Sequence, residues 1–154
     1  MSVATLVRPF NSFAQGLAWL APVFAPVFTL ITRLYVGWVF LKSGYLKLTD
    51  WQSTLFLFRE EYHVPLLPPY AAAVAGTASE LLFSVLVIAG LFGRLSALAL
   101  FAVNAVAVIA YSHVLLSEGF EAAIGQHYLW GFMLLVLAIH GPGTLSLDRY
   151  FPAR

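Results

Sequence analysis

Three polar side chains lie within long apolar stretches of the sequence, where a charge is costly. Glu80 lies near the middle of the second stretch, Asn104 at the middle of the third, and Arg33 within the first. A carboxylate at the centre of a bilayer costs about 3 kcal/mol on insertion scales unless it finds a partner. We therefore expect a buried Arg33–Glu80 pair with Asn104 nearby. Such a pair either only locks two helices together or also lines a ligand site.

A stripe of small and charged residues runs along the first apolar stretch. Its members recur at helical spacing and share one face of a helix. On the second stretch, Gly76, Glu80 and Ser84 recur every four residues in the same way. Two such faces either let helix backbones touch or leave room for a ligand with an apolar body and a polar head, and both alternatives stay open. The stripe consists of Arg33, Gly37, Phe40, Gly44 and Lys47.

A second polar cluster is expected where the first and third stretches end and the fourth begins. It comprises Lys47, His113, His127 and Tyr128. These side chains could form hydrogen bonds with the carbonyls of a quinone head. His113 and His127 could instead bind haem b or a metal ion between two antiparallel helices. No third ligand pattern supports this alternative, so we expect no metal site and disfavour haem b.

The composition indicates the environment that must hold these residues. The chain has 154 residues, of which 61% are apolar and 10% charged, whereas soluble domains carry about 25% charged residues. This excludes an ordinary soluble enzyme. The formal net charge of +1 argues against a nucleic-acid partner, and the absence of Cys excludes disulfides, thiolate zinc sites and Cys-ligated iron–sulfur clusters.

The pattern predicts an all-α integral membrane bundle of four transmembrane helices. Residues 1–25 are expected to contain an amphipathic interfacial helix, over about 8–24, because large apolar residues recur there on one side. Residues 26–154 are expected to form the transmembrane domain. Its spans are predicted at about 26–48, 69–92, 95–116 and 120–140, since each is close to the roughly 20 apolar residues that a bilayer requires.

Four spans place both termini on one side of the membrane. The positive-inside rule counts Lys and Arg residues, and it favours cytoplasmic termini by a small margin. The terminal side carries Arg8, Arg94, Arg149 and Arg154, and the other side carries Lys42, Lys47 and Arg59.

Several motifs, in this order and spacing, resemble the DoxX family of small membrane proteins. The resemblance covers about residues 30–150. Its first helix has an Arg, a Gly, a Phe, a second Gly and a Lys, as the stretch RLYVGWVFLKSGYLKL does here. The remaining motifs are Tyr-His-Val-Pro at 62–65, Glu80, Gly-Leu-Phe-Gly-Arg at 90–94 and Gly-Pro-Gly-Thr-Leu-Ser-Leu-Asp at 141–148.

The resemblance implies a bacterial inner-membrane protein with a link to oxidoreductase and quinone chemistry, because relatives are membrane subunits of thiosulfate:quinone oxidoreductases. We expect a subunit that binds quinone in the bundle and docks, within the lipid bilayer, on other membrane subunits or further copies of itself. It is not expected to be catalytic alone, since the chain lacks Cys and a dinucleotide-binding glycine motif. The alternatives are a non-enzymatic structural or assembly subunit, or a small-solute carrier or receptor.

Overall fold

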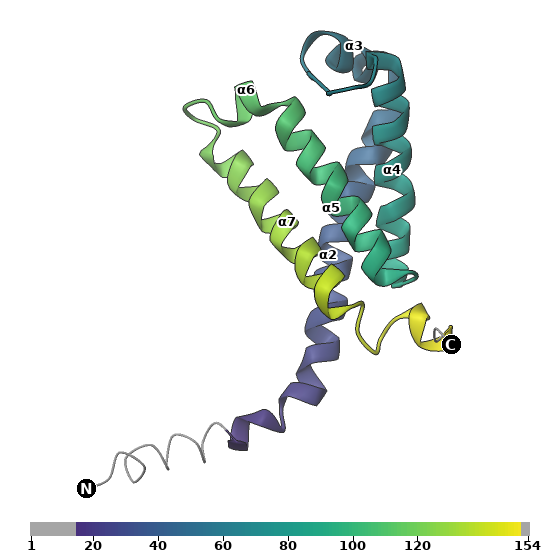
Figure 1. Ribbon diagram of the computed structural model, residues 1–154, viewed down its shortest axis with the longest axis vertical. Helices are drawn as coiled ribbons and strands as arrows, with labels where there is room; N and C mark the ends of the chain where they lie inside the picture. The colour runs from purple at the N-terminus through teal and green to yellow at the C-terminus, as the bar shows by residue number, and fades with distance from the viewer. Residues whose placement is uncertain (1–14, 152–154) are drawn as a thin grey trace, which may run out of the picture.

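The chain folds as a bundle of membrane-length helices. The computed structural model describes residues 15–151. Each of its four long helices is apolar enough to cross a membrane, which confirms the predicted all-α bundle. These helices are α2 (Ala21–Thr49), α4 (Pro69–Ala89), α5 (Gly93–Ala110) and α7 (Glu121–His140). Shorter elements lie at the ends of the bundle (Figure 1): α3 (Trp51–Glu60), α6 (Ser112–Leu115) and the 3-10 helix η1 (Leu147–Tyr150).

The first long helix begins earlier than the sequence predicted. α2 starts at Ala21, with Pro22 in its first turn, where the missing N–H has no helical partner to lose. Pro26 therefore lies inside the helix rather than at its start. The N-terminal turns of α2 extend beyond the other helices (Figure 1). Of the predicted interfacial helix over residues 8–24, residues 8–14 lie outside the described part of the chain, and residues 21–24 belong to α2.

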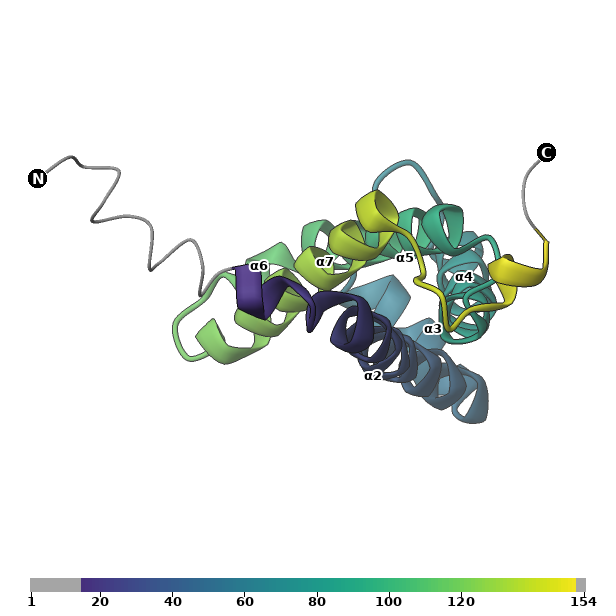
Figure 2. The same cartoon turned by 90° about the horizontal axis from the view of Figure 1, so that it is seen from below.

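The four long helices form two antiparallel pairs. α2 packs mainly on α4, α5 packs mainly on α7, and α4 joins the pairs by packing on α5 (Figures 1 and 2). Apolar side chains from all four helices fill the centre, which explains why the charged residues of the bundle lie to either side of it. This core includes Val36, Phe40, Val87, Leu100 and Leu134.

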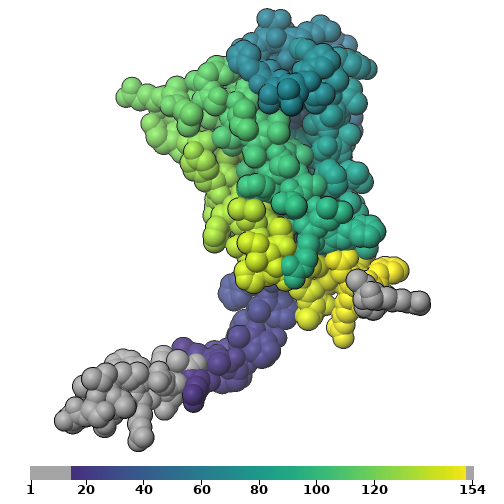
Figure 3. All heavy atoms as spheres, viewed as in Figure 1, coloured from purple at the N-terminus to yellow at the C-terminus, as the bar shows by residue number. Residues whose placement is uncertain are grey.

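A short helix that the sequence analysis did not predict covers one end of the bundle. The Asp50 side chain accepts a hydrogen bond from the Ser53 amide at 3.1 Å and so caps the start of α3. Leu55 and Phe58 of α3 then pack against small residues at the start of α4. Figure 3 shows α3 lying over this end of α4. The helix therefore closes the bundle at the point where the chain leaves α2.

The third predicted span is shorter than expected. α5 ends at Ala110, and Tyr111 leaves the helical conformation with φ −116° and ψ 20°, so residues 112–115 form the separate α6. At its other end α5 follows a tight turn from α4. Gly90 takes φ +67° there, in the left-handed region that glycine enters without steric cost.

Candidate functional site

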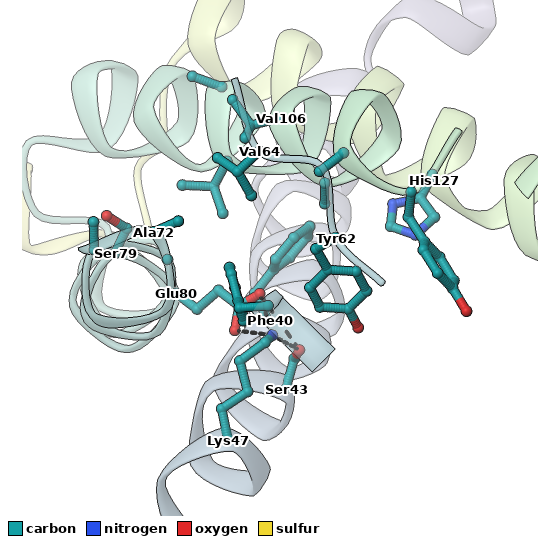
Figure 4. Close-up of a pocket in the computed structure, with 18 of the residues that line it drawn as sticks. Phe40, Ser43, Lys47, Tyr62, Val64, Ala72, Ser79, Glu80, Val106 and His127 are labelled. Carbon is teal, nitrogen blue, oxygen red and sulfur yellow. Dashed lines mark hydrogen bonds and ion pairs between the residues drawn. The ribbon is translucent and has the colours of Figure 1, made fainter. Parts of the chain in front are cut away.

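An apolar cavity of about 510 Å³ lies inside the bundle, at the end where α2 finishes and α7 begins. We call this the Lys47 end, and define it by Lys47, Tyr62, Glu80, Tyr111 and His127, all of which line the cavity. The walls come from α2, α4, α5, α7 and the segment that follows α3 (Figure 4). Most lining side chains are aliphatic or aromatic, so the few polar groups are conspicuous.

An ion pair forms one wall of the cavity (Figure 4). Lys47 Nζ lies 2.7 Å from Glu80 Oε1 and 2.6 Å from Oε2, and it also donates to Ser43 Oγ at 2.8 Å. The Lys47 and Glu80 side chains are 20% and 9% exposed. Gly44 makes the pair possible, because a Cβ there would lie 3.1 Å from the Glu80 Cβ and hold α2 and α4 apart. Ser43 was not among the site residues predicted from the sequence.

The predicted Arg33–Glu80 pair is wrong. Arg33 is buried, but its guanidinium lies about two helical turns further along α4. It donates to the carbonyls of Val87 at 2.9 Å and Ile88 at 2.6 Å. The antiparallel register explains the error: Gly37 faces Ile88 and Gly44 faces Glu80, so Lys47 is the cation of α2 at the level of the carboxylate. Depth counted from estimated span ends was too coarse to distinguish the two cations.

Arg33 also holds the C-terminal segment. Its Nη1 donates to the carbonyls of Pro142 at 2.8 Å and Leu145 at 2.7 Å. Close by, Asp148 accepts hydrogen bonds from the first two amides of the α5 turn, Phe92 and Gly93, both at 2.7 Å. A carboxylate at a helix N-terminus is stabilised by the helix dipole. Arg33 and Asp148 therefore hold together the end of α4, the start of α5 and the C-terminal segment. We call this the Arg33 end.

Asn104 connects α5 to α7 rather than joining the charged residues. Its Nδ2 donates to the His127 carbonyl at 3.0 Å, and its Oδ1 lies 2.9 Å from His127 Nδ1. The His127 ring also packs edge-on against Trp130, with ring centroids 5.0 Å apart. This pairing orients the His127 imidazole in the wall of the cavity opposite Lys47 (Figure 4).

The other predicted members of this cluster lie outside the cavity lining. His113 packs against His63, with ring centroids 4.8 Å apart, and Tyr128 is 63% exposed. His113 and His127 thus have different partners. Among residues 15–151, no three His, Cys, Asp or Glu side chains gather as a metal-binding group.

The glycine stripe is closed by helix packing. A Cβ at Gly37 would lie 2.5 Å from Ile88 Cγ1, and one at Gly44 would lie 2.9 Å from Leu81 Cγ. Ser84 is fully buried. Of the two alternatives for this face, the structure favours backbone contact between α2 and α4. The cavity lies beside this closed face, and the α2 residues that line it are Val39, Phe40, Ser43 and Lys47.

A row of aromatic rings borders the cavity on the side of α3. Tyr62 packs edge-on against Phe58 and Tyr111, with ring centroids 5.0 and 5.1 Å apart. Burial raises the pKa of the Tyr62 hydroxyl, with smaller contributions from Tyr111, Glu80 and Glu61. Sequence reasoning missed Tyr62 because nothing in the Tyr-His-Val-Pro segment indicates that it folds back over the helices.

Comparison with known proteins agrees with this architecture. The DoxX family model matches residues 28–113. The chain is also 30% identical over 132 residues to the inner membrane protein YphA of Escherichia coli (strain K12), an alignment that covers 80% of this chain and 90% of that protein. The chain belongs to the DoxX family. No solved structure gives a significant match.

Membership of the DoxX family and the four apolar helices make the chain a multi-pass inner membrane protein. The family match includes both Lys47 and Glu80 of the ion pair, as well as Arg33 and Asn104. It ends before α7, which contributes His127 to the cavity.

Proposed function

We propose that this DoxX protein is a membrane subunit linked to an oxidoreductase, and that its cavity binds an amphiphile of the quinone type. The observation that carries the proposal is one apolar cavity with an ion pair in its wall. Its volume of about 510 Å³ lies within the range of roughly 300–1,000 Å³ found for small-molecule sites. Apolar walls with a few fixed polar groups suit a flat head that carries two polar atoms.

The residues present fit such a head. Phe40 and Trp130 pack edge-on, with ring centroids 5.8 Å apart, and both line the cavity together with Tyr62. Aromatic walls provide offset or edge-on contacts for a planar ring. The Tyr62 hydroxyl and the polar atoms of His127 could hold the ring oxygens in place.

The cavity also offers a route for an isoprenoid tail. Three of its lining residues are exposed on the outer surface of α4 and α5, namely Ala75, Ala102 and Val106. In a membrane this surface contacts lipid, so an apolar tail could leave between the two helices without crossing a polar region.

A bound quinone would supply two-electron redox chemistry, and a partner protein would carry the other redox centre. The chain itself has no Cys and no dinucleotide-binding motif. Its own side chains would bind and orient the head and keep water away from it. The charge bias of the loops supports cytoplasmic termini as part of the proposal.

Extraction of lipids from the purified protein tests the proposal. We expect quinone to co-purify with the wild-type chain in mild detergent. Ala107→Phe should abolish this by filling the cavity, because Ala107 lines it. Ala105→Phe is the matched control, since Ala105 lies on the same helix, is similarly half-buried and does not line the cavity.

Two results would contradict quinone binding. One is a folded wild-type protein that carries no quinone and takes up none when a short-chain quinone is added. The other is quinone retained equally by both Ala→Phe variants. A ligand-free chain that purifies with other membrane subunits would instead support the structural or assembly role.

A further inference from the structure

The hydrogen-bond donors of Lys47 are already in use. An ammonium group has three N–H donors, and Lys47 Nζ lies within hydrogen-bond distance of Glu80 Oε1, Glu80 Oε2 and Ser43 Oγ. A carbonyl oxygen of a ligand could accept a hydrogen bond from Lys47 only if one of these bonds were broken. The cation in the wall therefore offers little to a ligand that brings only acceptors.

The carboxylate beside it has acceptor capacity left. Two carboxylate oxygens provide about four acceptor positions. Lys47 occupies two of them and the Ser43 hydroxyl lies 3.4 Å from one oxygen. Glu80 can therefore accept a further hydrogen bond from a group inside the cavity, and it would do so as a charged acceptor, which makes the bond stronger.

The opposite wall also presents an acceptor. Because Asn104 Nδ2 donates to the His127 carbonyl, it is Asn104 Oδ1 that faces the ring, and His127 Nδ1 must carry the proton of that bond. In the neutral imidazole the other nitrogen, Nε2, is then an acceptor. Nε2 makes no hydrogen bond with residues 15–151, and its ring lines the cavity.

The remaining polar groups of the cavity wall do not change this excess of free hydrogen-bond acceptors over free donors. Trp130 Nε1 is a donor without a partner among the described residues, but it is buried from solvent and no ligand reaches it without rearrangement. The hydroxyls of Tyr62, Ser79 and Tyr111, which also line the cavity, either donate or accept, so they discriminate little between ligands.

We infer that the cavity prefers the reduced, dihydroxy form of its ligand to the oxidised, dicarbonyl form, with Glu80 and His127 Nε2 as the acceptors of its two hydroxyls. The inference rests on the proposed function and adds to it the chemistry of the head. A hydroquinone brings two O–H donors to two unsatisfied acceptors, whereas a quinone would bring two further acceptors and leave those in the walls unpaired, which costs binding energy.

Binding of one short-chain benzoquinone and of its hydroquinone, measured without oxygen on the detergent-purified chain, tests this inference. We expect the hydroquinone to bind at least about tenfold tighter, which would raise the midpoint potential of the bound couple by about 30 mV. His127→Phe should remove most of the preference. Tyr128→Phe is the matched control, because it removes a polar atom from an exposed neighbour outside the cavity.

A second variant keeps the test decisive if His127→Phe does not fold. Glu80→Gln gives the same wall an amide donor, so it should shift the preference toward the quinone. Equal or tighter binding of the quinone by the wild-type chain would overturn the inference and leave the proposed function standing. Binding of neither form would overturn the proposed function and the inference with it.

Discussion

Two cations of α2 are removed from solvent, Arg33 near the middle of the helix and Lys47 in its last turn, and their partners differ in kind. Arg33 is 3% exposed and donates to four backbone carbonyls from α4 and the C-terminal segment. Lys47 is bonded to the side chains of Glu80 and Ser43 and lies beside a cavity. A flat guanidinium with five donors suits fixed carbonyls, whereas a lysine paired with side chains can rearrange. Arg33 is therefore a structural clamp, whereas the surroundings of Lys47 can accept a ligand.

Around the glycines compared here, the Arg33 end is packed more tightly than the Lys47 end. At the Arg33 end, a Cβ on Gly90 would lie 2.5 Å from the Ser146 Cβ and 2.7 Å from Arg33 Cζ, and one on Gly93 would overlap Pro142. At the Lys47 end, the nearest atom to a Cβ on Gly76 would be 3.5 Å away, on Phe58. Space for a ligand therefore remains where the charges are held by side chains.

The largest effect is expected from loss of the clamp. Arg33→Met removes a donor from four carbonyls, and a buried carbonyl left unpaired costs about 1–3 kcal/mol. We expect the free energy of unfolding to fall by about 4 kcal/mol, measured by denaturant titration in detergent. Lys42→Met is the control, because Lys42 lies on the exposed face of the same helix, and it should change little. An Arg33→Met protein as stable as wild type would show that the clamp contributes nothing.

The Lys47 end should respond differently because its partners are side chains. Lys47→Met and Glu80→Leu should each cost about 3 kcal/mol, since either change strands a partly buried charge. The double variant should recover to within about 1 kcal/mol of wild type, because an apolar pair of similar volume replaces the ion pair. A double-mutant cycle measured by thermal unfolding checks this. Strictly additive losses would mean that the two residues do not interact.

Two glycines provide a smaller test of the same contrast. Gly37→Ala places a methyl group 2.5 Å from Ile88 Cγ1 and 3.3 Å from a backbone oxygen, so α2 and α4 must shift and about 2 kcal/mol of stability should be lost. Gly76→Ala meets only an ordinary contact and should stabilise α4 by up to about 1 kcal/mol through helix propensity. Equal losses from both variants, compared by unfolding midpoints, would remove the packing difference between the ends.

Much of the fold could be predicted from the sequence, and the reason is physical. Apolar runs of membrane length interrupted by Gly and Pro leave few alternatives to spanning helices. Burial of Arg33, Glu80 and Asn104 followed from the cost of exposing polar groups to lipid, and all three are buried.

The pairing of these residues could not be predicted in the same way. It depends on the register between α2 and α4, which is set by the positions at which Gly37 and Gly44 allow contact. This register places Glu80 beside Lys47 rather than beside Arg33. The cavity depends on α3 and the segment that contains Tyr62, which follow a path that no periodic pattern indicates. Asp148 was noted as part of the C-terminal motif, but its role at the start of α5 appears only when distant segments meet.

The smallest expected effect concerns Tyr62, which lies outside the spanning helices beside the cavity. Burial raises the pKa of its hydroxyl above the usual 10.0. The unfolded chain therefore releases this proton at a lower pH than the folded chain, so the stability that neutral Tyr62 contributes is complete below about pH 10 and is lost as the pH rises through the raised pKa. Tyr62→Phe should reduce the drop in unfolding midpoint between about pH 9 and about pH 11, while Tyr128→Phe should leave it unchanged. An identical drop in all three proteins would place the Tyr62 hydroxyl in contact with water and the Lys47 end open on the side of α3.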